Sequence, residues 1–95
     1  MKSKFRFISD PGHAWLEVPR SLLGTLGIPT QISKCSYQRG DLVYLEEDCD
    51  APRFIEAYKA KIGEFEFIEV HQEHTRIRGY ESYAYAGEYN YRPEN

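Results

Sequence analysis

Residues 4–18, KFRFISDPGHAWLEV, decide the fold because they describe two short strands joined by a turn. Apolar residues alternate with charged or polar ones on both sides of a central Pro-Gly pair, which is the pattern of half-buried strands. A four-residue loop sets Phe7 opposite Leu16 and Arg6 opposite Glu17. One side of the predicted hairpin is then apolar and the other carries paired charges, so we expect this register.

The turn contains Ser9, Asp10 and His13, three residue types that also form hydrolytic sites. A serine nucleophile needs a histidine within hydrogen-bonding distance and a third group that orients that histidine. In the predicted hairpin Ser9 pairs with Ala14, while Asp10 and His13 flank the turn, where aspartate commonly binds nearby backbone amides. We interpret these residues as a structural turn and predict no catalytic residue.

Helix and hairpin patterns alternate along the rest of the chain. Residues 18–29 predict a short helix, and residues 32–47 predict a second hairpin around the turn QRGD. Residues 50–63 predict a longer helix with Asp50 as its N-cap, followed by a strand over 64–72. The expected fold is α+β: a mainly antiparallel sheet of about five strands with two helices on one face, in the order ββαββαβ.

The chain of 95 residues is long enough for one small domain with a single core. We place this compact α+β domain at residues 1–79. Residues 80–95 hold five of the eight tyrosines, and their alternation suits either an edge strand or a flexible tail.

Composition and charge narrow the classes of function. Twelve basic and fifteen acidic residues give a net charge of −3, which disfavours general binding of nucleic-acid phosphates. No apolar run is long enough to span a bilayer, and the first ten residues lack the apolar stretch of a secretory signal. We therefore expect a cytoplasmic protein that does not enter a membrane.

Cys35 and Cys49 are the two cysteines of the chain. In a cytoplasmic protein we expect both thiols to be reduced and structural. The predicted second hairpin also sets Cys35 across from Tyr44 and far from Cys49, which argues against a disulfide.

Glu46, Glu47, Asp48 and Asp50 crowd the start of the predicted second helix. Carboxylates can hold Mg²⁺ or Ca²⁺, but the spacing lacks the alternating ligands and the glycine of an EF-hand loop. Acidic groups are also favoured at a helix N-terminus by the helix dipole. We therefore predict neither a metal nor a cofactor, and keep a small enzyme or a metal protein that uses residues 46–50 as an alternative.

Several aromatic and charged side chains look exposed, and such residues anchor protein interfaces. Trp15 falls on the charged face of its strand, so we expect it to be partly exposed unless something, such as a helix of the domain, covers it. The arginines at 76 and 78, followed by tyrosines, could instead stack on bases and hold phosphate. Given the acidic chain we favour a protein partner, bound by Trp15, Glu46, Glu47, Asp48, Arg76, Arg78, Tyr80, Tyr83 and Tyr85.

Four stretches, SDPGHAWLEVP, LGIP, SYQRGDLVYLEEDCD and FIEAYKA, resemble small uncharacterised accessory proteins of bacteria, phages and plasmids. The likeness covers roughly residues 7–62 and carries no activity, cofactor or catalytic residue with it. It implies a setting in which compact proteins of mobile elements act by binding a host protein.

The function expected from the sequence is therefore a small cytoplasmic protein-interaction module without enzymatic activity, in the setting of an accessory or anti-defence factor. The alternative is nucleic-acid or nucleotide binding through Arg76, Arg78 and the neighbouring tyrosines. Exposed strand edges in so small a sheet also favour a homodimer.

Overall fold

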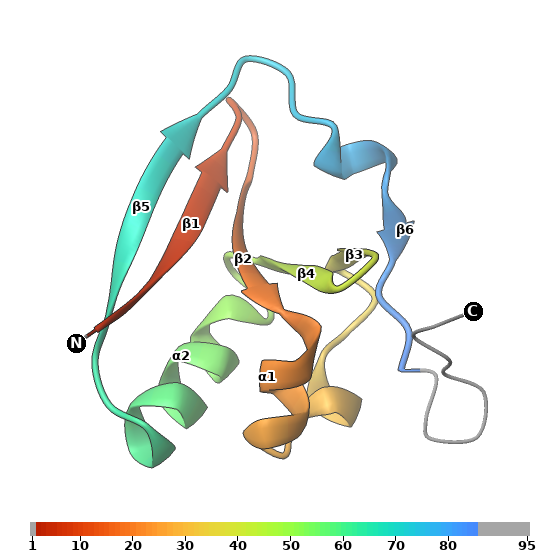
Figure 1. Cartoon of the computed structure of the whole chain (residues 1–95). Helices are drawn as coiled ribbons and strands as arrows, with labels where there is room; N and C mark the ends of the chain where they lie inside the picture. The colour runs from red at the N-terminus through yellow and green to blue at the C-terminus, as the bar shows by residue number, and fades with distance from the viewer. Residues whose placement is uncertain (1, 86–95) are drawn as a thin grey trace.

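The computed structural model describes residues 2–85 and shows one α+β unit with a single sheet (Figure 1). Tyr89 and Tyr91 of the expected tyrosine-rich segment lie outside the described residues. In chain order the elements are β1 Ser3–Ser9, β2 Ala14–Pro19, α1 Arg20–Thr25, η1 Pro29–Gln31, β3 Tyr37–Arg39, β4 Leu42–Glu46, α2 Ala51–Lys61, β5 Phe65–His71, η2 Ile77–Gly79 and β6 Glu81–Ser82.

The first hairpin has the predicted register. Phe7 pairs with Leu16 and Ser9 with Ala14, so four residues form the loop between β1 and β2. The guanidinium of Arg6 lies 3.1 Å from the carboxylate of Glu17 on the polar side, as the alternating pattern predicts.

The sheet is mixed, with the strand order β5-β1-β2-β4-β3-β6, and not as uniformly antiparallel as the sequence suggested. Strand β5 pairs in parallel with β1 from Ser3↔Phe65 to Ser9↔His71, while the other neighbouring strands pair antiparallel. Helix α2 carries the chain from β4 across the sheet to β5, and a strand that follows such a crossover runs in the direction of the strand before it. Because β4 already runs parallel to β1, β5 does so too.

Both helices pack on one face of the sheet, as expected (Figure 1). Leu23 of α1 and Phe54 and Tyr58 of α2 are buried against sheet residues that include Leu16 and Phe5. The Phe5 ring meets the rings of Phe54 and Tyr58 edge to face at 5.7 and 5.6 Å. This aromatic cluster joins the first hairpin to the second helix and forms the main core.

The opposite face of the sheet carries a second, smaller core. Trp15 is only 2 % exposed there and packs with Ile8, Tyr44 and Ile77. The segment after β5 leads to η2 (Figure 1), and Ile77 of η2 packs with the tryptophan. The cover over Trp15 is therefore the polar segment around Ile77, and the two α-helices lie on the other side.

The second hairpin is tighter than predicted. Gly40 has a φ of 58°, which permits a two-residue turn, and Arg39 pairs with Leu42. Tyr37, and not Cys35, therefore lies opposite Tyr44. The expected pairing of Cys35 was wrong because the sequence reading assigned four residues to this turn.

Helix α2 differs from the prediction at both ends. Asp50 precedes the helix but makes no side-chain capping bond, because its carboxylate accepts hydrogen bonds from Ser33 and Ser36. The helix ends at Lys61, before the predicted end, and Ile62 is 50 % exposed. Gly63 follows with a φ of 137° and turns the chain toward β5.

Residues 80–85 continue onto the sheet. Glu81 and Ser82 form β6, which pairs with β3, and the Tyr83 side chain is buried in the main core with its hydroxyl donating to the Pro29 carbonyl. Among the described residues, no helix has the length and apolar character needed to cross a membrane.

We predict that Ile77→Ala destabilises the protein by about 2 to 5 kcal/mol, because it opens a cavity over Trp15. Ile68→Ala is the matched control, since Ile68 is 43 % exposed on β5 and its truncation leaves no cavity. Urea unfolding measures both variants. Equal stability of the two variants would contradict the second core.

Candidate functional site

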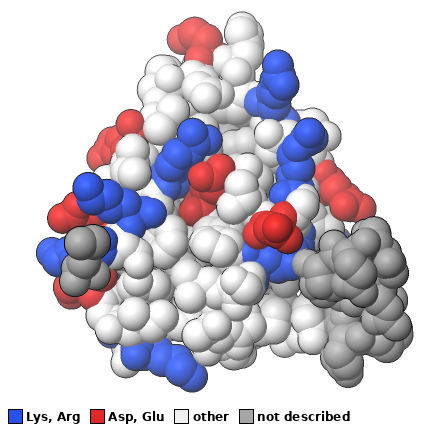
Figure 2. All heavy atoms as spheres, in the orientation of Figure 1, with Lys and Arg blue, Asp and Glu red and all other residues white. Residues whose placement is uncertain are grey.

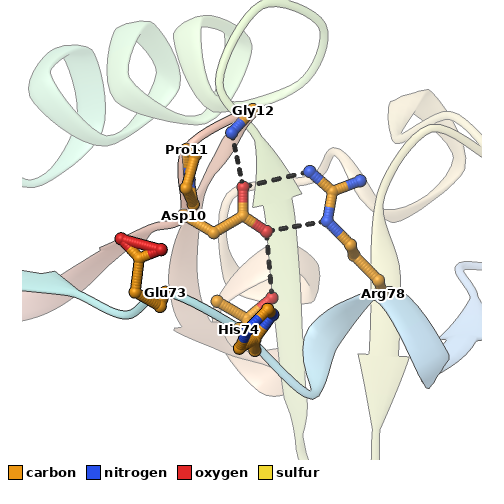
Figure 3. A pocket seen from close by; sticks show the side chains of 7 residues that line it. Asp10, Pro11, Gly12, Glu73, His74 and Arg78 are labelled. Atoms are coloured by element: carbon orange, nitrogen blue, oxygen red, sulfur yellow. Dashed lines mark hydrogen bonds and ion pairs between the residues drawn. The ribbon is translucent and has the colours of Figure 1, made fainter.

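The Asp10 carboxylate organises the turn between β1 and β2. Its Oδ1 accepts a hydrogen bond from the backbone amide of Gly12 at 2.9 Å (Figure 3) and another from that of His13, also at 2.9 Å. The Asp10 amide in turn donates to the His13 carbonyl at 2.8 Å. The prediction that this aspartate serves the turn is thus supported by three local hydrogen bonds.

The same carboxylate binds Arg78 from the distant η2 segment. The Arg78 Nε donates to Oδ2 at 2.7 Å and Nη2 to Oδ1 at 3.0 Å, which is a bidentate ion pair (Figure 3). These bonds hold the pKa of Asp10 well below its usual range, although burial acts in the opposite sense. The Arg78 guanidinium also lies 5.5 Å from the centre of the Trp15 ring, so it covers the tryptophan while it holds the turn.

A small cavity of about 210 Å³ lies beside this ion pair. Asp10, Pro11 and Gly12 line one side, and Glu73, His74, Thr75 and Arg78 line the other (Figure 3). Asp10 and Arg78 neutralise each other through two hydrogen bonds, while Glu73, which also lines the cavity, is exposed. The cavity therefore forms where the segment over residues 73–78 packs against the β1–β2 turn.

The structure separates the serine, aspartate and histidine of the turn. Ser9 Oγ lies 3.1 Å from Nδ1 of His71, its parallel neighbour on β5, while Asp10 binds Arg78. The other ring nitrogen of His71 is 4.0 Å from Glu73, and both side chains are well exposed. The sequence did not predict this Ser9–His71 contact, because it depends on the parallel pairing of β5 with β1. It lacks a closely bound third group, so the geometry supports a cross-strand contact better than an activated nucleophile.

His13 turns instead toward the acidic stretch. Its Nδ1 lies 3.4 Å from Oε2 of Glu46, and ligand atoms of His13, Glu46 and Glu47 lie within 4.8 Å of one another. Oε1 of Glu46 accepts bonds from the backbone amides of Asp48 and Cys49, each at 2.9 Å. Of the predicted acidic stretch, Glu46 and Glu47 therefore converge with a histidine, while Asp50 is held by serines.

The residues predicted to bind a partner do not form one surface. Trp15 and Tyr83 lie in the two cores, and Glu46 is 9 % exposed and binds the loop before α2. Arg78 holds the β1–β2 turn, and Tyr80 packs against Tyr44 with their ring centres 5.2 Å apart. The exposed members of the predicted set are Asp48, Arg76, Arg78 and Tyr85, of which Arg78 is paired with Asp10, while Glu47 and Tyr80 are half-buried.

Three large exposed apolar side chains outside the predicted set lie at the β5 edge or just before it. Phe67 and Ile68 are 48 % and 43 % exposed in the middle of β5, and Ile62 is 50 % exposed just before it. The ring of Phe67 rests against those of Phe7 and Phe65, so it lies on the helix side of the sheet. Sequence reasoning recognised the strand and its apolar residues, but it could not place the strand at an edge.

Basic and acidic side chains are interspersed on the face shown in Figure 2. The Lys and Arg side chains of the described residues on that face do not form a continuous stripe. Such a stripe is the usual electrostatic mark of nucleic-acid binding.

Comparison with known proteins gives no relative: no family model, no curated protein and no solved structure matches the chain.

We predict that Asp10→Asn lowers stability at neutral pH, with a difference that depends on pH. The native pKa of Asp10 is depressed, so its contribution is complete above the unfolded pKa of about 4 and is lost as pH falls toward the lower native value. The stability of the wild type should therefore approach that of the variant below about pH 4.

Melting temperatures measured from pH 7 to pH 2 check this prediction. Asp41→Asn, at an exposed turn position, is the matched control and should follow the wild type throughout. A constant difference between wild type and Asp10→Asn across the whole range would contradict the native ion pair.

Proposed function

We propose that the protein is a non-enzymatic interaction module that binds a partner strand along the β5 edge. The observation that carries this proposal is the position of β5, a seven-residue strand at the end of the sheet with Phe67 and Ile68 exposed at its centre. A strand added at such an edge gains backbone hydrogen bonds along its whole length and side-chain contacts at every second position.

The backbone of β5 supports this mode of binding. Strand β1 pairs with one side of β5, and no other strand among residues 2–85 pairs with the outer side. Natural proteins commonly protect such an edge with charged side chains, above all lysine, with proline or with a bulge. The segment FEFIEVH contains neither proline nor lysine, its acidic residues are Glu66 and Glu69, and its register with β1 is continuous over all seven residues.

The side chains of β5 indicate what kind of partner fits. Phe67 and Ile68 point to opposite faces of the sheet, because neighbouring residues of a strand alternate. A partner strand could therefore cover one apolar residue on each face. Four exposed glutamates lie along or next to the strand, at positions 64, 66, 69 and 73.

These glutamates favour a partner whose strand alternates basic and apolar residues. Opposite charges across a strand pair stabilise it, and like charges destabilise it. Two copies of β5 would bring two sets of glutamates together, so a heterologous basic strand fits better than self-association. The homodimer expected from exposed strand edges is therefore the less favoured occupant of this edge.

The proposal keeps the protein-interaction function expected from the sequence and changes the surface that performs it. Asp48, Arg76 and Tyr85 remain exposed and could add contacts outside the β5 edge. An accessory or anti-defence role in a mobile element, exercised on a host protein in the cytoplasm, rests on the sequence resemblance alone. Nucleic-acid binding is less favoured, because Arg78 of the proposed Arg-Tyr surface is paired with Asp10.

A basic β-strand peptide tests the docking mode directly. We predict that the peptide KVKIRVK binds the protein and protects the backbone amides of β5 from hydrogen exchange, and that rising salt weakens its binding. Phe67→Ser/Ile68→Ser should weaken binding at least tenfold, since burying each apolar side chain contributes about 1.5 to 3 kcal/mol.

Two controls make this experiment specific. Tyr85→Ser removes an equally exposed aromatic side chain beyond the opposite edge of the sheet and should leave affinity unchanged. The acidic peptide EVEIEVE, which has the same apolar pattern, should bind far more weakly. Equal binding of both peptides, or protection of β6 in place of β5, would overturn the proposal.

Divalent metal binding is a second candidate function, supported by the convergence of His13, Glu46 and Glu47. One imidazole and two carboxylates suit Zn²⁺ or Mn²⁺ better than Ca²⁺, which takes oxygen ligands. The Oε2 atom of Glu46 faces His13, while its Oε1 atom is already held by backbone amides. The loop before α2 thus holds the Glu46 carboxylate in the orientation that a metal bound at His13 would need.

Calorimetric titration checks this candidate. We predict that Zn²⁺ binds the wild type more tightly than Ca²⁺ and that His13→Ala abolishes the Zn²⁺ signal. His74→Ala, which changes another exposed histidine outside the group, should retain it. Zn²⁺ binding that survives His13→Ala would place the metal elsewhere.

A further inference from the structure

Two loops that are separate in the sequence meet beside the start of α2. The carboxylate of Asp50 accepts hydrogen bonds from the amide and hydroxyl of Ser33, at 3.0 and 2.8 Å, and from the hydroxyl of Ser36. Ser36 is fully buried and Asp50 is 3 % exposed. The segment before β3 is therefore fastened to the segment after β4 by a buried polar cluster.

A further bond fixes the two loops against the sheet. The hydroxyl of Ser36 accepts a hydrogen bond from the backbone amide of Glu46 at 3.0 Å. Ser36 thus binds the last residue of β4 and the residue before α2 at once. The residues next to Ser36 and Asp50 in the chain are therefore also held near each other.

The neighbours in question are the two cysteines. Cys35 precedes Ser36, Cys49 precedes Asp50, and both cysteines are exposed. The Cys35 amide donates to the hydroxyl of Ser33 at 3.1 Å, and the Cys49 amide to Oε1 of Glu46 at 2.9 Å. Both backbones are therefore held in place beside the buried cluster, and both side chains are exposed.

The Cys35 side chain lies close enough to the Cys49 thiol to interact with it. Cys35, and after it Glu46, raise the pKa of Cys49 to about 12. The expectation that the two cysteines lie far apart was wrong.

We propose that Cys35 and Cys49 form a reversible intramolecular disulfide when the protein meets a small-molecule disulfide such as glutathione disulfide. The Cys35 thiolate attacks one sulfur of the oxidant and releases one glutathione thiolate, which takes up a proton. The Cys49 sulfur, after losing its proton to solvent, attacks the Cys35 sulfur and releases the second glutathione. Two protein thiols are oxidised, and one disulfide is reduced to two thiols.

The bond would close a loop that contains the whole β3–β4 hairpin and fasten it to the start of α2. A loop of roughly 15 residues limits the unfolded chain enough to stabilise a small domain substantially. For a domain of this size we expect the melting temperature to rise by about 10 °C or more.

Incubation of the full chain with excess glutathione disulfide tests the proposal. We expect a monomer whose mass is lower by two hydrogens, a peptide map that links Cys35 to Cys49, a higher melting temperature, and reversal of all three by dithiothreitol. Cys35→Ser and Cys49→Ser are matched controls. Each should stop at one glutathione adduct without the rise in melting temperature.

Other products would overturn the proposal. Stable addition of two glutathione molecules to the wild type would show that the sulfurs do not reach each other. A disulfide-linked dimer on a non-reducing gel would assign the thiols to a contact between copies. An internal disulfide without any thermal stabilisation would contradict the native geometry of the pair.

Discussion

The Asp10 carboxylate is the interaction on which the rest of the structure depends. It receives two backbone amides of its own turn and a bidentate guanidinium from a residue 68 positions later in the chain. The first set of bonds closes the hairpin, and the second fastens the η2 segment over Trp15. One side chain thus joins the local turn to a segment far along the chain, and a neutral residue at this position would weaken both sets of bonds.

Sequence reasoning predicted what depends on local pattern. The alternation around Phe7 and Leu16 determines the register of the first hairpin. A slip by one residue would turn every apolar side chain of one strand to the other face of the sheet. The cover over Trp15 has no such signature. Around Ile77 the segment is polar, and its contribution to the second core depends on the Arg78 ion pair. A short polar segment with one buried isoleucine is read as a loop from sequence alone.

The cysteine pair shows how one turn length changes a chemical conclusion. With a four-residue turn, Cys35 would lie in the hairpin opposite Tyr44. The positive φ of Gly40 shortens the turn, shifts Tyr37 into that position and leaves Cys35 in the loop before β3. Only then can the serines on either side of Cys35 reach Asp50. The position of the two cysteines therefore depends on the backbone conformation of Gly40, which residue types alone do not specify.

The two edges of the sheet explain why the proposed docking surface lies at β5. Strand β6 at one edge is two residues long, and short edge strands offer little backbone for another chain. Strand β5 at the other edge has seven residues, with Phe67 and Ile68 exposed. The helices and the η2 segment cover the two faces of the central strands. Within residues 2–85, β5 is thus the element whose apolar side chains and outer backbone both face solvent, and its glutamates determine which partner it would accept.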